Sequence, residues 1–112
     1  MKLPNPGSAV IEREKIAHYL LDPAHPDNGG KAAFFLSLGF NQEDWQKLAL
    51  AFRKLAARAE IAKSVETSHG CKYIVDGRIE TPVGKSPAVR TIWIIDRGAE
   101  APRLVSAYPC QE

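Results

Sequence analysis

The sequence predicts an α+β protein in which three helices come first and a roughly four-stranded antiparallel sheet follows, with the helices on one face of the sheet. Two observations support this prediction. Up to about residue 59, apolar residues recur at the 3.6-residue spacing of helices. Beyond about residue 60 the period changes to two, as in strands, and short turn-forming stretches separate the segments. Helices that precede strands in this way favour a sheet with one covered face and one face open to solvent or ligand.

The first helix is predicted at about residues 12–21, because Ile16, Tyr19 and Leu20 fall on one helical face. It ends at an Asp-Pro pair, since proline and the residue before it both resist helix. A loop rich in Pro, Gly and Asn follows. A second helix is then predicted over residues 31–38.

The third helix has the strongest helical repeat in the chain. Asn41 can cap its N-terminal end, and the helix is predicted to run to about residue 59. Its apolar positions recur at helical spacing and comprise Trp45, Leu48, Ala49, Phe52, Leu55 and Ala56.

The second half of the chain alternates between apolar and polar residues. Four strands are predicted, at about residues 62–68, 71–80, 88–96 and 103–109. The stretches TPVGKSP and RGAEAP have the composition of turns. Regular alternation on the last strand would put Leu104, Ser106 and Tyr108 on one side of the sheet.

Length and composition fit one globular domain that spans residues 1–112. Of the 112 residues, 45% are hydrophobic and 25% are charged. The 15 basic and 13 acidic residues leave a net charge of +2, which is too small to indicate nucleic-acid binding by itself. No apolar stretch approaches the roughly 20 residues of a membrane span, and the N-terminus lacks the apolar region of a secretory signal. We therefore expect a cytoplasmic protein, without membrane contact, whose Cys71 and Cys110 remain thiols.

Two polar features stand out from this framework. Ser106 and Tyr108 lie on the last strand, where they are either site residues or ordinary residues at a sheet edge. In HPDNGGKA, His25 precedes a glycine pair and Lys31 falls in the first turn of a helix. A cation there opposes the helix dipole, but it can share a bound phosphate with the free N–H groups of the helix. The alternative is a solvated surface lysine, and the spacing of a P-loop is absent.

Two further residues are candidates for contacts to a ligand. His69 lies in a predicted turn between strands and can titrate near neutral pH. Arg90 lies in the middle of a predicted strand, where it is either a site residue or part of a solvated face. The histidines and cysteines do not have metal-ligand spacing, so we expect no zinc site and no cofactor.

Several motifs together resemble a known family. They are MKLPN, YLLDPAHP followed by GGKAAFFLSLGF, VRTIWII and PRLVSAYP. This combination, which spans nearly the whole chain, resembles a bacterial family of small stand-alone domains of unknown function. It is also similar to the toxin tips of contact-dependent inhibition systems, which are grouped with the barnase–EndoU–colicin–RelE superfamily of metal-independent ribonucleases. The resemblance implies helices followed by a four-stranded antiparallel sheet, with RNA bound in a cleft on the sheet.

The resemblance also implies roles for particular residues. EndoU-like members have a Ser or Thr and a Tyr two residues apart on a late strand, and Ser106 and Tyr108 match that pattern. Related toxin tips have a Lys in the helix after a His-Pro loop, which Lys31 and His25 match. The histidine pair of EndoU is not evident here, but RelE-like members cleave RNA without a histidine base.

Metal-free RNA cleavage needs a base for the 2′-OH, an acid for the 5′-oxygen and cations for the phosphate. His25 or His69 can act as base or acid, and Tyr108 can act as acid or orient the phosphate. Lys31 and Arg90 can stabilise charge, and we expect Ser106 to donate a hydrogen bond. The resulting hypothesis is a toxin-like endoribonuclease held in check by a cognate antitoxin or immunity protein from a neighbouring gene. The alternative is an inactive binding module of the same fold, which binds a partner protein or nucleic acid.

Overall fold

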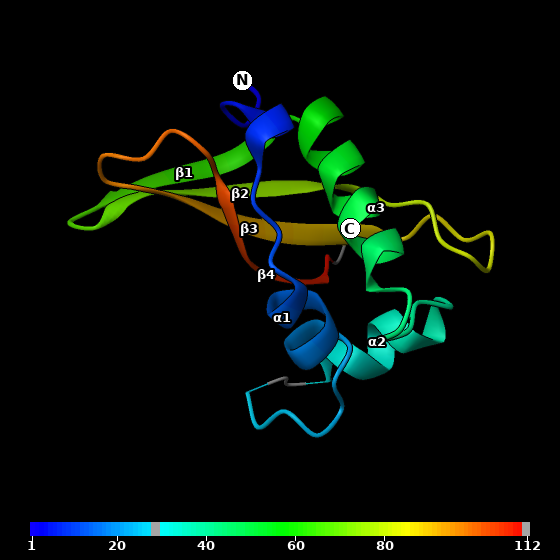
Figure 1. Cartoon of the computed structure of the whole chain (residues 1–112). Helices are drawn as coiled ribbons and strands as arrows, with labels where there is room; N and C mark the ends of the chain where they lie inside the picture. Colours follow the sequence, from blue (N-terminus) through cyan, green and yellow to red (C-terminus); the bar gives the residue numbers. More distant parts are fainter. Residues whose placement is uncertain (28–29, 111–112) are drawn as a thin grey trace.

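The computed structural model describes residues 1–27 and 30–110. The helical segments are η1 (Pro6–Ser8), α1 (Arg13–Lys15), η2 (Ile16–Leu20), α2 (Lys31–Ser37) and α3 (Trp45–Arg58). The strands are β1 (Ile61–Thr67), β2 (Gly70–Arg78), β3 (Ala88–Asp96) and β4 (Arg103–Pro109). In Figure 1, α3 and the N-terminal segment lie over one face of the sheet, α1 and α2 lie near β4, and the β1–β2 hairpin projects away from the helices. The predicted α+β plan is confirmed.

The four strands form one antiparallel sheet in the order β1-β2-β3-β4. Apart from Thr91, the buried side chains of the sheet are apolar. The sheet contributes Val75, Val89, Trp93, Leu104 and Ala107 to the core, all of them buried. Helix α3 contributes Leu48, Phe52, Leu55 and Ala56. A Cβ atom on Gly77 would lie 3.1 Å from Cγ of Leu55, so the glycine lets α3 approach β2 closely.

Regular alternation fails on β4, where the prediction for Leu104 was wrong. The register passes from Ile92 opposite Ser106 to Trp93 opposite Leu104, so β4 has one extra residue, a β-bulge at Val105. As a result Leu104 is buried on the core face. Ser106 remains on the opposite face together with Tyr108, which is the pairing that alternation predicts for these two.

The first two helical segments differ in detail from a regular helix. The predicted helix at residues 12–21 is one short α-turn followed by the π-helical η2, in which the N–H of Leu21 donates to the carbonyl of Ile16. A π-turn widens the helix locally and is frequent at functional sites. Asn41 does not cap α3 itself, because its Oδ1 accepts from the N–H of Asp44 in the turn that precedes the helix.

The N-terminal segment contacts both edges of the sheet. Lys2 forms an isolated antiparallel bridge with Glu60, next to the start of β1. Val10 forms a parallel bridge with Arg103 on β4, and the N–H of Leu104 donates to the carbonyl of Val10 at 3.0 Å. The segment therefore covers the first residues of the β4 edge and satisfies their backbone groups.

A polar side chain is buried in the core between β2 and β3. The Thr91 hydroxyl donates to the carbonyl of Val75 at 2.8 Å and accepts the indole N–H of Trp93 at 2.8 Å. Thr91 and Trp93 have no exposed surface, so this pair of bonds satisfies groups that water does not reach. None of the helices among the described residues is long and apolar enough to cross a membrane.

Candidate functional site

The hydroxyl of Tyr19 is the centre of the candidate site. In η2, Ile16, Ala17 and Leu20 are buried in the core, which holds the turn in place, and Tyr19 is half-buried beside β4. Its hydroxyl oxygen lies 3.4 Å from Oγ of Ser106. The sequence placed Tyr19 on an apolar helix face, and no local pattern indicated that its hydroxyl reaches the last strand.

Lys31 joins this pair from α2. Its ammonium donates to the Tyr19 hydroxyl at 2.8 Å, so Lys31 is linked through Tyr19 to Ser106. Lys15, on α1, lies 5.2 Å from the centre of the same ring. Burial raises the pKa of Tyr19, but the hydrogen bonds of Lys31 and Ser106 and the charges of both lysines outweigh burial. The net result is a Tyr19 pKa below its ordinary value.

His25 packs against the same phenol ring. The two ring centres are 5.0 Å apart and nearly perpendicular. Nδ1 of His25 accepts the backbone N–H of Asp27 at 3.1 Å. A ring nitrogen that accepts a hydrogen bond carries no proton, so in this arrangement Nε2 carries it. His25 is therefore arranged as a hydrogen-bond donor beside Tyr19.

Tyr108 and Arg90 extend the site along the open face of the sheet. In the sheet register Asp76, Arg90 and Tyr108 form one row across β2, β3 and β4, next to the row that contains Ser106. The guanidinium of Arg90 donates from Nε and Nη2 to the two oxygens of Asp76, each at 2.8 Å. Asp76, with a smaller effect from Tyr108, raises the pKa of Arg90. Arg90 is thus held by a bidentate ion pair on a solvated sheet face.

His69 is the one predicted site residue that the fold separates from the others. It lies in the turn between β1 and β2, where its carbonyl accepts the N–H of Arg97. Next to it in the register, Gly70 pairs with Asp96, whereas Arg90 pairs with Asp76. Six residues of extended chain therefore separate Arg90 from this end of the sheet, or about 20 Å. The register therefore does not place His69 beside Arg90, and its role as a phosphate ligand stays a prediction.

An open cleft of about 640 Å³ adjoins Tyr19, His25 and Ser106. Five of its other lining side chains are charged, with both signs represented. The cations are Lys15 and Arg103, and the carboxylates are Glu12, Glu14 and Asp27. Among the described residues no group of His, Cys, Asp and Glu has an arrangement that could hold a metal ion. The chemistry that this cleft can offer is hydrogen bonding, proton transfer by the phenol and charge stabilisation by nearby cations.

Comparisons with known proteins identify a sequence family and a similar fold for this chain. A sequence model described as "Domain of unknown function (DUF6883)" matches residues 2–111. No curated protein sequence matches the chain. Among solved structures, the fold is similar to that of a chain in a contact-dependent growth inhibition toxin–immunity protein complex from Klebsiella pneumoniae 342. The TM-score is 0.73 at 15% identity, over 96% of this chain and 97% of that chain. This likeness establishes a shared fold.

Proposed function

Because this chain belongs to the DUF6883 family, whose description leaves the activity open, we propose a function from the geometry around Tyr19: a metal-independent endoribonuclease of toxin type. The observation that supports it is the Tyr19 hydroxyl held between the Lys31 ammonium and Ser106. A phenol with a lowered pKa beside cations is suited to proton transfer. The fold shared with a chain of a toxin–immunity complex agrees with a toxin-type role.

The proposed reaction uses two phenols. The Tyr19 phenolate removes the proton of the ribose 2′-OH, and the 2′-oxygen attacks the adjacent phosphorus. The bond from phosphorus to the 5′-oxygen breaks, Tyr108 gives its proton to that oxygen, and a 2′,3′-cyclic phosphate remains. Ser106 and Tyr108 are two residues apart on one face of β4, so about 7 Å separates their backbone positions. Because the Tyr19 hydroxyl lies beside Ser106, this spacing suits a phosphate held between the base, Tyr19, and the acid, Tyr108.

The cations have a separate task in this scheme. Lys31 stabilises the phenolate before the reaction, and Lys31 and Arg90 then offset the negative charge that develops on the phosphate oxygens. Ser106 and Nε2 of His25 donate hydrogen bonds to the same oxygens. An uncontrolled ribonuclease is harmful to the cell that makes it, and we therefore propose a cytoplasmic protein kept inactive by a protein partner of immunity or antitoxin type.

A second candidate function has one specific observation in its favour. The cleft beside Tyr19 contains three carboxylates, Glu12, Glu14 and Asp27, which repel the phosphates of RNA. This arrangement favours a non-enzymatic module that binds a partner protein through the same cleft. The two candidates differ in whether RNA is cut.

The test is incubation of purified protein with total RNA in EDTA, and separately with translating ribosomes. We expect the parent to give discrete fragments with 2′,3′-cyclic phosphate ends. Tyr19→Phe and Lys31→Ala should slow cleavage by about 10²–10⁴-fold, the range for loss of acid–base catalysis. Lys63→Ala, an equal change of charge on exposed β1, is the matched control and should cleave at the parent rate. Intact RNA in both reactions with folded parent would contradict the proposal and support the binding module.

A further inference from the structure

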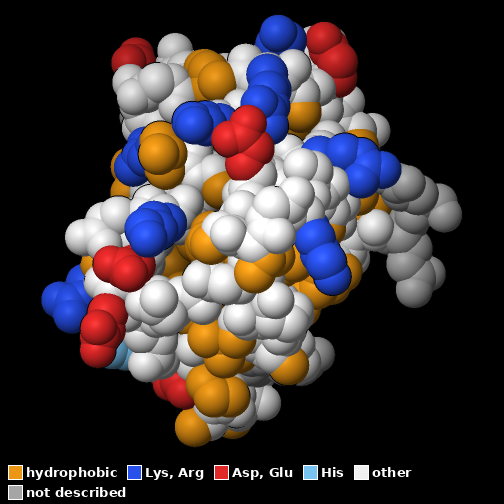
Figure 2. Space-filling view, turned by 90° about the vertical axis from the view of Figure 1, so that its right-hand side faces the viewer, with side chains coloured by type: hydrophobic (Ala, Val, Ile, Leu, Met, Phe, Trp, Pro, Cys, Tyr) orange, Lys and Arg blue, Asp and Glu red, His pale blue; other side chains and the backbone are white. Residues whose placement is uncertain are grey.

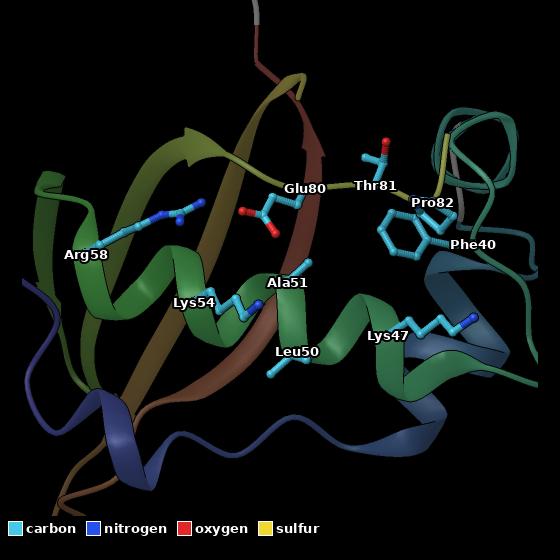
Figure 3. Close-up of a pocket in the computed structure, with 9 residues that line it drawn as sticks. All are labelled: Phe40, Lys47, Leu50, Ala51, Lys54, Arg58, Glu80, Thr81 and Pro82. Atoms are coloured by element: carbon cyan, nitrogen blue, oxygen red, sulfur yellow. The ribbon is translucent and has the colours of Figure 1, made fainter. Parts of the chain in front are cut away.

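A second hollow lies between α3 and the segment that follows β2. It has a volume of about 200 Å³ and shares no lining residue with the cleft at Tyr19. Figure 3 shows Lys47, Lys54 and Arg58 along α3 on one side of this groove and Glu80 and Pro82 on the other. We call it the α3 groove. In Figure 1 the segment of residues 79–87 projects to the right, and Figure 2 shows the molecule from that side. On this face Lys and Arg side chains lie beside hydrophobic ones.

The α3 groove has an apolar floor. Leu50 and Ala51 of α3 form part of the floor, and Pro82 faces them from the opposite wall. Leu50 is 52% exposed, and Val83, which follows Pro82, is 51% exposed. A large apolar side chain that stays accessible in a hollow, as Leu50 does here, favours an apolar group as ligand.

The charges of the groove are mostly positive, with three cations and one carboxylate. Lys54 forms no ion pair within the part of the chain that the structure describes. Nζ of Lys47 lies 3.9 Å from Oδ2 of Asp44, the residue before α3. Arg58 donates to the carbonyl of Arg78 at 3.1 Å, a neutral group that leaves its charge uncompensated. The positions of the three cations on α3 follow helical spacing, so they point along one side of the helix. This stripe attracts a negatively charged ligand.

The wall opposite α3 is held in its shape before any ligand binds. The Thr81 hydroxyl donates to the carbonyl of Lys85 at 2.7 Å and accepts its N–H at 3.1 Å. Gly39 has φ +94°, and a Cβ atom there would lie 2.9 Å from Cβ of Pro82. The glycine thus lets the end of α2 pack directly on this wall. A preformed wall lowers the entropy cost of binding.

We propose that the α3 groove binds an acidic segment of a partner protein, with an apolar side chain of that segment inserted between Leu50 and Pro82. Charge complementarity selects the carboxylates, and the apolar floor selects the inserted side chain. Single-stranded RNA fits less well, because base binding relies on exposed aromatic rings. The aromatic residue that lines the groove, Phe40, is only 3% exposed.

The two hollows have no lining residue in common, so a segment bound in the α3 groove does not itself occupy the Tyr19 cleft. This inference does not depend on ribonuclease activity. It holds equally for a binding module.

The test uses a fluorescein-labelled peptide of about ten residues, made of Asp and Glu around two central leucines, and measures anisotropy at low and physiological salt. Lys54→Gln should weaken binding by up to about fivefold, the upper end of the range for one surface charge pair. Glu80→Gln should strengthen it by a similar factor. Lys63→Gln on β1 removes the same charge outside the groove and should leave the affinity unchanged. Replacing the two leucines of the peptide by glycine should abolish binding.

Three results would overturn the proposal. One is a peptide that fails to bind the folded parent. Another is equal weakening by Lys54→Gln and Lys63→Gln, which would indicate non-specific attraction. The last is competition by an oligouridine RNA that, in NMR spectra of the protein, shifts the backbone amide signals of Ala51 and Thr81 most strongly. That result would make the groove an RNA site. Shifts at these two amides with the peptide alone are the supporting result, whether or not the protein cleaves RNA.

Discussion

Replacing Thr91 by valine tests what the buried hydroxyl contributes to the fold. Valine keeps the shape of the side chain and removes the oxygen that accepts the indole N–H of Trp93 and donates to the carbonyl of Val75. Thr91 and Trp93 are completely buried. Water therefore cannot replace the lost partner, and the indole N–H is left without an acceptor.

The magnitude follows from these two bonds. An unpaired buried N–H costs about 1–3 kcal/mol, and a lost neutral hydrogen bond about 0.5–1.5 kcal/mol. The methyl group that valine adds in place of the hydroxyl offsets part of this, so we expect the free energy of unfolding to fall by about 2 kcal/mol. At about 4 °C per kcal/mol for a domain of this size, the Tm falls by about 8 °C. The assay is urea denaturation followed by far-UV circular dichroism.

The control is Thr91→Ser, which keeps the hydroxyl and removes one methyl group, at a cost of about 1 kcal/mol. The double variant Thr91→Val with Trp93→Phe removes both partners of one bond. Its destabilisation should be smaller than the sum of the two single changes. The reasoning is refuted if Thr91→Val is as stable as the parent, or if Thr91→Ser is the less stable of the two.

Three further predictions concern the Tyr19 site and the α3 groove. Burial raises the pKa of Tyr19, but the contact with Lys31 contributes to a net decrease below 10.0; phenolate absorbance near 295 nm should therefore appear at lower pH in the parent than in Lys31→Ala, and Tyr19→Phe should lack this early transition. Because the folded pKa is the lower one, Tyr19 ionisation adds stability above the unfolded value, and this contribution is lost as the pH falls through the folded pKa; urea midpoints of parent and Tyr19→Phe across this range measure it, and parallel curves would contradict the lowered pKa. Gly39→Ala should reduce the free energy of unfolding by at least about 1 kcal/mol, because φ is +94° and the new Cβ would meet Pro82; a thermal melt equal to that of the parent would show that the wall yields.

The order of elements was predictable because it depends on local pattern. The apolar repeat of α3 and the β-branched residues of β3 each indicate one kind of structure without reference to the rest of the chain. The pairing of neighbouring strands follows from their short connections. Those two levels of information determine the helices, the antiparallel sheet and its covered face.

The bulge in β4 was not predictable from the same pattern. RLVSAYP contains no glycine at the irregular position, and its consecutive apolar residues Leu104 and Val105 do not by themselves indicate which of the two faces the core. The bulge depends on tertiary contacts instead. Leu104 packs in the core opposite Trp93 and bonds to Val10, whereas Ala107 is also buried on the same face. Leu104 and Ala107 can both be buried on this face only if β4 has one extra residue between them.

The candidate site was half predictable. Residue type and position singled out Lys31, His25, Ser106 and Tyr108, but the sequence did not indicate which of them share contacts. Tyr19 contacts three of these residues, Lys31, Ser106 and His25, yet its helical spacing matches that of an ordinary core residue. A tyrosine can pack its apolar ring in the core and also present its hydroxyl to a site, so only the fold reveals that the hydroxyl of Tyr19 reaches Ser106 and Lys31.

The bridge between Val10 and Arg103 also sets an order of events when the chain is made. Residue 10 leaves the ribosome well before β4 exists, so the edge that this segment covers forms last. The Tyr19 hydroxyl likewise has no Ser106 to meet until β4 has been synthesised. Whatever chemistry the cleft performs is therefore withheld from the nascent chain and begins only once β4 has left the ribosome and has joined the sheet.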